Sequence, residues 1–246
     1  MRLNFKIKTV DAAESTSLLM RDWQNAGQLN HGDVLRARDQ SDGIGQSGNR
    51  WESEKNKNLT FSFYIEPKFI EASEVFLLNK IIALAVSDYL GEIQIAKVKI
   101  KWPNDIYVGD KKIAGMLTHN SFLGDKLEYS IVGLGLNINQ TKFISEAPNP
   151  ISLKQISGNS YNLEKELTRL LDCIKKRYTQ LENNNRPLLD AEYLSRLYGI
   201  NEQRDYSDRE GKFSGRIKGI DSYGRLLVEK ANQHVTTYDV KEIEFL

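Results

Sequence analysis

The chain has 246 residues, of which 40% are hydrophobic and 27% are charged, a composition typical of a globular protein rather than a disordered or fibrous one. Its 34 Lys and Arg are balanced by 33 Asp and Glu, so the formal net charge of +1 lacks the basic excess of a dedicated nucleic-acid binder. A single cysteine excludes an internal disulfide, and the absence of an apolar run of signal-peptide or membrane-spanning length predicts a cytoplasmic protein without membrane contact.

The first 90 residues are expected to form strands, two helices and one long loop. Apolar residues at helical spacing predict a helix at 14–26 and an amphipathic helix at 72–90, with a single apolar face. Residues 41–58, rich in Gly, Ser, Asn and charge, predict a long irregular loop. Alternation of apolar and polar residues indicates three strands, at 3–10, 34–40 and 59–65.

The middle of the chain is typical of antiparallel hairpins. Turns are predicted at 109–110 and 124–125, both Gly-Asp, between runs of strand-forming residues. The expected strands are 98–102, 105–108, 111–119 and 127–139.

The remainder predicts two helices and an all-β tail. Asn162 is suited to cap a long helix, and a second helix is expected at 191–198. From about residue 204, short strands and Gly-containing turns are typical of a small β-barrel. We therefore expect an α+β fold with a mixed, mainly antiparallel sheet over residues 1–200 and a barrel over 201–246.

Residues 43–48, GIGQSG, match the G-x-G-x-x-G pattern of dinucleotide-binding proteins. That pattern needs a helix directly after the glycines, whereas a charged loop and a strand follow here, which argues against a Rossmann site. Two interpretations remain: a loop whose backbone amides approach an anion, and a plain surface loop.

A second segment, Lys-Trp-Pro-Asn-Asp at 101–105, interrupts a strand. Pro103 fixes its own φ and has no N–H, so the strand ladder must break there. A break of this kind presents side chains at a strand end, where Lys101 is either held against a developing anion or solvated.

Glycines within apolar strands form a third signal. Gly115, Gly133 and Gly135 indicate either close approach of a ligand or a β-bulge, and Asn137, just beyond them, carries an amide that can read a flat heterocycle or cap a loop. His119 is a lone histidine that follows an apolar run, which favours an ordinary strand residue over a catalytic base, and no Cys/His cluster has zinc-site spacing.

Together these segments match a family in order and spacing. KWPNDIYV at 101–108, KIAGML at 112–117 and GLGLNIN at 133–139 resemble the catalytic core of bacterial biotin protein ligases, whose fold is class II synthetase-like. The segment IKGIDSYGRLLVE, at 217–229, resembles the SH3-like β-barrel that follows this core.

The resemblance implies a ligase reaction in two steps. The carboxylate of biotin attacks the α-phosphate of ATP in the presence of Mg²⁺, releasing pyrophosphate and forming biotinyl-5′-AMP. The amine of a lysine on a biotin carboxyl carrier protein domain then displaces AMP. Because the motifs begin at residue 15, we expect no room for the DNA-binding domain of repressing members, and a monomer or weak homodimer that does not bind DNA.

The resemblance also assigns residues by position. Lys101 is the expected catalytic cation, in contact with the biotin carboxylate and the phosphate, and no metal site of the protein itself is expected. The expected biotin-binding residues are Ser15, Thr16, Ser17, Gln40, Gly43, Ile44, Gly45, Gln46, Lys101 and Gly115. The expected ATP- and adenylate-binding residues are Gly45, Gln46, Arg50, Trp51, Asn104 and Asn137.

The sequence departs from the family in its glycine-rich loop. Ile44, Gln46 and Ser47 stand where the family often has arginine or another basic residue, which leaves Arg50 as the arginine of the loop. Glutamine cannot copy the bidentate, charge-assisted bonds of arginine. We therefore expect a working ligase with a less cationic loop. The alternatives are a lipoate or octanoate transferase of related fold and a non-catalytic biotin-binding homologue.

Overall fold

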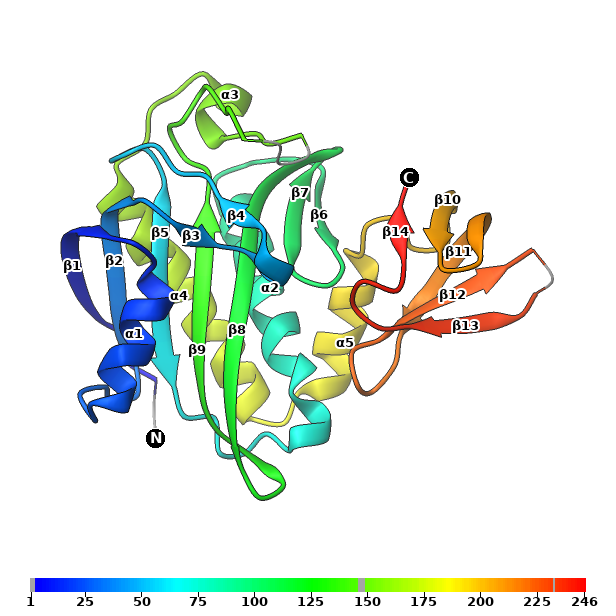
Figure 1. Cartoon of the computed structure of the whole chain (residues 1–246), viewed down its shortest axis with the longest axis horizontal. Helices are drawn as coiled ribbons and strands as arrows, with labels where there is room; N and C mark the ends of the chain where they lie inside the picture. The colour runs from blue at the N-terminus through cyan, green and yellow to red at the C-terminus, as the bar shows by residue number, and fades with distance from the viewer. Residues whose placement is uncertain (1–2, 146–148, 232) are drawn as a thin grey trace.

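The computed structural model describes residues 3–145, 149–231 and 233–246, and Figure 1 shows a larger body built on one sheet beside a smaller all-β body. The large sheet has seven strands in the order β1-β2-β5-β9-β8-β7-β6, in which β1 and β2 are parallel and the other neighbours antiparallel. The expected α+β fold with a mixed, mainly antiparallel sheet is thus confirmed. The strands are β1 (Lys6–Ala13), β2 (Asp33–Gln40), β5 (Leu59–Ile65), β6 (Val98–Lys101), β7 (Asp105–Val108), β8 (Lys111–Leu123) and β9 (Lys126–Leu136).

Helices pack on both faces of this sheet, but α1 leaves part of its own face open, and we call this the open face. On one face lie α2 (Phe76–Glu92) and α4 (Leu163–Glu182), with α5 (Arg186–Ser195) packed on α2, whereas α1 (Thr16–Asn25) lies across the opposite face (Figure 1). The predicted cap of α4 is confirmed, since the Asn162 side chain accepts from two backbone N–H groups of the first turn. A short helix that the sequence did not predict, α3 (Leu153–Ser157), follows β9.

Strand β5 shows how the residue pattern separates the two faces. Leu59, Phe61 and Phe63 point into the main core with α2, while Ser62 and Tyr64 point to the face that α1 covers. Every residue of β5 is buried because elements pack on both faces of this central strand.

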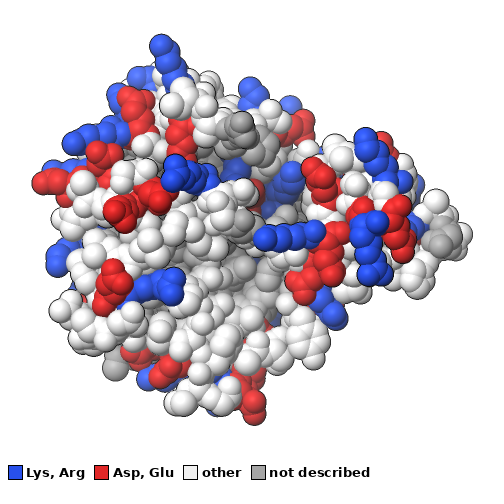
Figure 2. Space-filling model, viewed as in Figure 1, with Lys and Arg blue, Asp and Glu red and all other residues white. Residues whose placement is uncertain are grey.

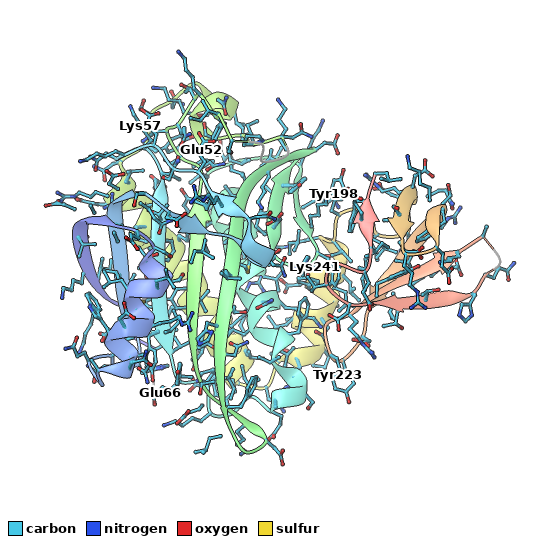
Figure 3. The ribbon with its side chains drawn as sticks, in the orientation of Figure 1. Glu52, Lys57, Glu66, Tyr198, Tyr223 and Lys241 are labelled. Atoms are coloured by element: carbon cyan, nitrogen blue, oxygen red, sulfur yellow. The ribbon has the colours of Figure 1, made fainter. Side chains whose placement is uncertain are left out.

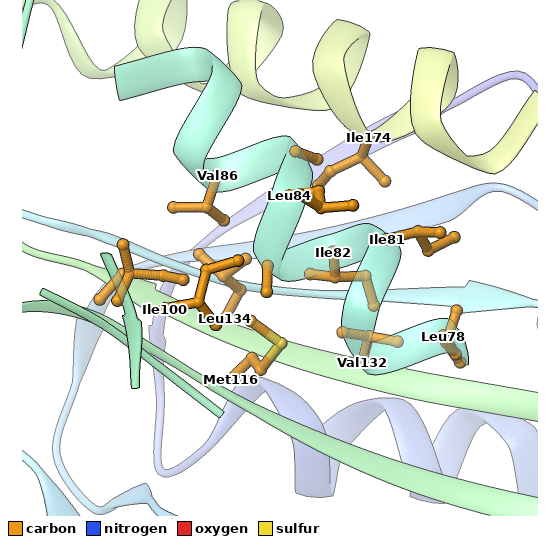
Figure 4. Close-up of a cluster of buried hydrophobic side chains, with 14 of the residues drawn as sticks. Leu78, Ile81, Ile82, Leu84, Val86, Ile100, Met116, Val132, Leu134 and Ile174 are labelled. Carbon is orange, nitrogen blue, oxygen red and sulfur yellow. The ribbon is translucent and has the colours of Figure 1, made fainter. Parts of the chain in front are cut away.

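Two helix predictions need correction. Helix α2 begins at Phe76, after a 3₁₀ turn over 72–74, and it is not amphipathic. It is buried nearly all round because it lies between the sheet and the other helices, as its apolar side chains in Figure 4 show. Helix α5 begins earlier than predicted, at Arg186, because Pro187 suits a first helical turn, and it ends at Ser195.

The predicted loop over 41–58 is only partly irregular. It contains a small hairpin of β3 (Gly43–Ile44) and β4 (Arg50–Trp51), with a 3₁₀ turn over 46–48 between them. A hydrogen bond of 2.7 Å from the Gly45 N–H to the Asn49 carbonyl closes the hairpin. Figure 1 shows this hairpin crossing the open face of the sheet in front of β9 and β8.

The smaller body is an antiparallel sheet in the order β13-β12-β11-β10-β14. It contacts the larger body where the Trp102 indole N–H donates to the Gly224 carbonyl at 2.8 Å. None of the helices within the described ranges is both long and apolar enough to cross a bilayer. The strands are β10 (Gln203–Asp208), which was not among the predicted strands, and β11 (Gly211–Ile220), β12 (Leu226–Lys230), β13 (Val235–Tyr238) and β14 (Glu244–Phe245).

Candidate active site

The open face of the large sheet carries a pocket between the start of α1, the β3–β4 hairpin and strands β7 to β9. It encloses about 680 Å³ of empty space when the solvent at its open mouth is included. One end is rich in hydroxyl and amide groups and the other end is charged, so the two ends suit chemically different parts of one ligand.

The uncharged end is preorganised by a hydrogen-bonded cluster. The Gln40 Oε1 accepts from the Thr16 backbone N–H at 3.0 Å and lies 3.3 Å from the Thr16 hydroxyl. Because a backbone N–H can only donate, this contact fixes the amide of Gln40 with its Nε2 donor free to face a ligand. The hydroxyls of Thr16 and Ser17 lie 2.8 and 3.0 Å from the buried Ser62 hydroxyl. Ser15, also predicted, lines the same end.

The floor of the pocket is flat because glycines face each other across two strands. Gly115 on β8 is paired with Gly135 on β9, and Gly133 lies two residues before Gly135 on the same strand. A Cβ at Gly135 would lie 2.2 Å from the Trp51 ring, so the indole lies directly on this backbone. A Cβ at Gly133 would lie 2.3 Å from the Ser17 hydroxyl. The chain's own side chains, Ser17 and Trp51, therefore occupy the space beside Gly133 and Gly135, and the close approach of a ligand to these glycines stays a prediction.

The charged end is built around one ion pair. The Lys112 Nζ lies 2.7 Å from Asp105 Oδ1, and both side chains are about four-fifths buried. Burial raises the pKa of Asp105, although the charge of Lys112 acts in the opposite direction. Asn104 also lines this end, but its amide donates to the Met116 carbonyl at 2.6 Å and so braces the strand.

The β3–β4 hairpin forms the outer wall. Ile44, Gly45, Gln46, Arg50 and Trp51 all line the pocket, as predicted from the sequence. The Arg50 side chain is 79% exposed and pairs with Asp42 at 3.0 Å, so it contributes little fixed charge to the interior. Among the described lining residues, Lys112 is therefore the cation that the fold holds in place.

Gly43 supports the hairpin rather than lining the pocket. A Cβ there would lie 2.6 Å from the Trp51 carbonyl oxygen and 2.5 Å from Gln40 Nε2. Glycine is needed at this position because backbone and side chain approach it from both sides.

Lys101 is not among the residues that line the pocket, although its backbone pairs with that of Asp105, which does line it. Its Nζ lies 4.9 Å from the ring centres of Tyr107 and Phe245 and 5.9 Å from that of Tyr198, at the junction with the smaller body. Figure 3 shows Tyr198 at this junction, and Figure 2 shows basic groups in the recess between the two bodies. Burial lowers the pKa of Lys101, and the charge of Asp105 opposes that shift. The geometry therefore does not bring Lys101 together with the other predicted ligand-binding side chains.

Asn137 also lies outside the pocket lining. It is buried behind β8, where its amide donates to the Ile151 carbonyl at 3.1 Å. This geometry fits the loop-capping interpretation of that asparagine. His119 is exposed on β8 and is not among the lining residues.

Sequence reasoning missed the two charged residues that the pocket brings together, Asp105 and Lys112. Both stand inside segments that were singled out, KWPND and KIAGML. The sequence places a carboxylate and an amine on adjacent predicted strands, which could have indicated an ion pair. To predict that the two side chains meet, the register of β7 against β8 was also needed. No group of three potential metal ligands occurs among the residues that the structure describes.

Comparison with known proteins identifies related molecules. Residues 10–137 match the biotin/lipoate A/B protein ligase family, and residues 207–239 match the biotin protein ligase C terminal domain. The bifunctional ligase/repressor BirA of Bacillus subtilis is 28% identical over 203 residues, which are 80% of this chain and 62% of that protein. The biotin–[acetyl-CoA-carboxylase] ligase of Paracoccus denitrificans is 26% identical over 198 residues, 78% of this chain and 82% of that protein.

A solved structure is similar over nearly the whole chain. The biotin protein ligase from Aquifex aeolicus in complex with biotin and ATP superposes with a TM-score of 0.81 and 26% identity, covering 98% of each chain. The chain spans less than two thirds of the BirA protein of B. subtilis, whereas it matches this structural neighbour end to end.

Proposed function

Because the chain belongs to the biotin/lipoate A/B protein ligase family, we propose that it activates biotin with ATP to biotinyl-5′-AMP and transfers biotin to a lysine of a biotin carboxyl carrier protein domain. The observation that carries this proposal is one pocket with neutral hydrogen-bonding groups at one end and the Lys112–Asp105 pair at the other. A ligand with a neutral ureido ring and a carboxylate tail matches that polarity. The match of residues 207–239 to a biotin protein ligase domain favours biotin over lipoate.

We propose that the uncharged end binds the ureido ring. Gln40 Nε2 and the hydroxyls of Ser15, Thr16 and Ser17 are the available partners there. Gln40 is held by Thr16, so its donor is set before the ligand arrives and less conformational entropy is lost on binding. The glycines at 115 and 133 would then let the apolar thiophane ring of biotin lie against the strands.

At the charged end we propose that Lys112, rather than Lys101, stabilises the reacting groups. An ammonium group beside a carboxylate nucleophile and a phosphate offsets the charge that develops as the anhydride bond forms. Asp105 fixes the position of Lys112 Nζ at 2.7 Å, and the site is partly closed to water by Trp51 and the hairpin. We propose that Trp51 and Arg50 lie beside the nucleotide, and that Mg²⁺ enters bound to the phosphate oxygens of ATP.

The hairpin positions at 44 and 46 are uncharged here, so we propose that the adenylate is retained mainly by Lys112 and by shape. Residues 1–200 and 201–246 are proposed as the catalytic core and the SH3-like barrel. A cytoplasmic location, a monomer or weak homodimer, and no binding to DNA stay predictions.

The proposal is tested by transfer of labelled biotin. Purified protein, ATP, Mg²⁺ and a carrier domain are expected to give a carrier labelled at one lysine, with one pyrophosphate released for each transfer. Lipoate in place of biotin is expected to give less than about a hundredth of this rate, because it has no ureido ring to match the buried hydrogen-bonding groups. Tight binding of biotin without release of pyrophosphate would instead identify a non-catalytic binder.

A further inference from the structure

Directly after Trp51, the carboxylate of Glu52 collects hydrogen bonds from a different part of the chain. It accepts from the Ser145 backbone N–H at 2.7 Å, from the Ile144 N–H at 3.0 Å and from the Gln140 side-chain amide at 2.7 Å. Burial opposes ionisation of this group, but the hydrogen bonds from residues 140–145 hold the pKa of Glu52 below its usual range. Figure 3 shows Glu52 beside β4, facing the loop that leads to α3.

Gln140 makes this contact rigid. It is only 1% exposed, and its Oε1 accepts from the Glu54 backbone N–H at 2.8 Å and from the Asn58 amide at 2.6 Å. Because the N–H of Glu54 can only donate, the Nε2 of Gln140 must point the other way, toward Glu52 and the Lys142 carbonyl. The segment after β4 is therefore joined to the segment after β9 by a hydrogen-bonded network that is buried at Gln140 and exposed at Ile144 and Ser145.

Both of the joined segments reach the charged end of the pocket. On one side, Trp51 precedes Glu52 and lies on Gly135. On the other side, residues 149–151 pair with Lys112, whose N–H donates to the Asn149 carbonyl and whose carbonyl accepts from the Ile151 N–H, each at 2.9 Å. The segment that binds Glu52 is joined to the residues after 151, because the Leu153 N–H donates to the Asn137 carbonyl at 3.1 Å. Glu52 thus connects the backbone that holds Trp51 with the segment beside Lys112.

We propose that Glu52 is a positioning residue for the nucleotide end of the site, tying the Trp51 wall and the loop behind Lys112 into one unit. It does not touch the pocket itself and is not among its lining residues. The β3–β4 hairpin has no arginine at 44 or 46. The hydrogen bonds of Glu52 hold the hairpin in position, so contacts with the ligand do not have to order it. The inference rests on the proposed ligase function, and it concerns the binding of ATP rather than of biotin.

The test compares Glu52→Gln with Glu54→Gln, an exposed carboxylate two residues away that gives the same change of charge. Glu52→Gln is expected to raise the KM for ATP about tenfold, because charge-assisted hydrogen bonds to two N–H groups are weakened. The Kd for biotin, measured by calorimetry, is expected to change less than about twofold, because the uncharged end shares none of these contacts. Glu54→Gln is expected to match the wild type in both quantities.

The pH profile separates positioning from general support of the fold. In the wild type, kcat/KM for ATP is expected to fall at acid pH as Glu52 is protonated. This acid limb of the pH profile is expected to be missing in Glu52→Gln. Should Glu52→Gln fold poorly, Glu52→Asp keeps the charge and is expected to give a smaller rise in KM with the acid limb retained.

Two results would overturn the inference. One is a KM for ATP in Glu52→Gln equal to that of Glu54→Gln. The other is an equal loss of ATP and biotin affinity together with a lowered Tm and an unchanged pH profile. A wild type that releases no pyrophosphate with biotin and ATP would instead refute the proposed function, so the two failures are distinguishable.

Discussion

Two lysines on strands β6 and β8, which lie on either side of β7, show how surroundings decide what a cation can do. Lys112 is paired with Asp105 in the pocket, beside the glycine floor and the β3–β4 hairpin. Lys101 projects among aromatic rings at the junction with the smaller body, and it has no carboxylate within ion-pair distance among the described residues. Only the first arrangement combines a fixed ammonium group with space for a ligand. This difference supports the proposal that Lys112 takes part in the chemistry, whereas Lys101 packs among aromatic rings.

The largest effect is expected from Lys112→Ala. Loss of one fixed donor at a developing charge lowers the rate of a reaction about a hundredfold to a thousandfold. We expect that loss in the rate of biotin-dependent pyrophosphate release under saturating substrates. Lys111→Ala, an exposed neighbour on the same strand, is the matched control and should stay within about twofold of the wild type.

A smaller loss is expected from Gly135→Ala. The added methyl group would lie 2.2 Å from the Trp51 ring, so the indole must leave the floor and disturb the wall next to Lys112. A displacement of about 1 Å near reacting groups is enough to lower kcat/KM for ATP about tenfold to a hundredfold. In Gly133→Ala the nearest atom is the Ser17 hydroxyl, which can rotate away with the loss of its bond to Ser62, so a loss under about fivefold is expected there. Equal losses in the two variants would contradict this account of the floor.

The ion pair also predicts a pH-dependent loss of stability. Lys112→Met leaves the buried Asp105 carboxyl without its ion-pair partner, which should lower the free energy of unfolding at pH 7 by about 1–2 kcal/mol. The pKa of Asp105 is already raised by burial, and removal of the lysine raises it further. A carboxyl group whose pKa is higher in the folded state takes up its proton there first, so the deficit should shrink as the pH falls from 7 toward 4. Denaturant unfolding at several pH values measures this, and a deficit that does not depend on pH would refute it.

The smallest effect is expected from Lys101→Met. Burial lowers the pKa of Lys101, which means that the fold disfavours its charge, and methionine keeps the apolar stem. The loss of the cation–π contacts of Lys101 and the removal of the cost of burying its charge should nearly cancel. The free energy of unfolding should therefore stay within about 0.5 kcal/mol of the wild type. Pyrophosphate release should stay within about threefold of the wild type. A loss comparable to that of Lys112→Ala would reverse the comparison between the two lysines.

Much of the fold could be predicted because its strands alternate or carry strong turn signals. The residues 59–65 and the hairpins at Gly109 and Gly124 are local patterns, and the structure contains them. Helix α2 was less predictable, because burial on all sides depends on what surrounds it and not on its own periodicity. The start of α5 depended on the first-turn preference of a single proline, which the apolar spacing does not reveal.

The uncharged end of the site was predictable, whereas the ion pair at its charged end was not. Ser15 to Ser17 and Gln40 line the pocket as family position implied. Strict alternation back from Gly115 would place Lys111 on the pocket face, but the register of β7 against β8 shifts between Ile106 and Tyr107, and Lys112 is placed there instead. A β-bulge of this kind inserts one residue and redirects a side chain, and such bulges are frequent beside active sites. The alternation of residue types in the sequence does not reveal this bulge.

A structure of the protein with a non-reactive biotinyl-adenylate analogue would test the central claim most directly. The account predicts the ureido ring at Gln40, and the phosphate (or its isostere) within about 3 Å of Lys112 Nζ. It also predicts that Lys101 Nζ makes no contact with the analogue. A phosphate bound by Lys101, with Lys112 still paired only with Asp105, would contradict the account.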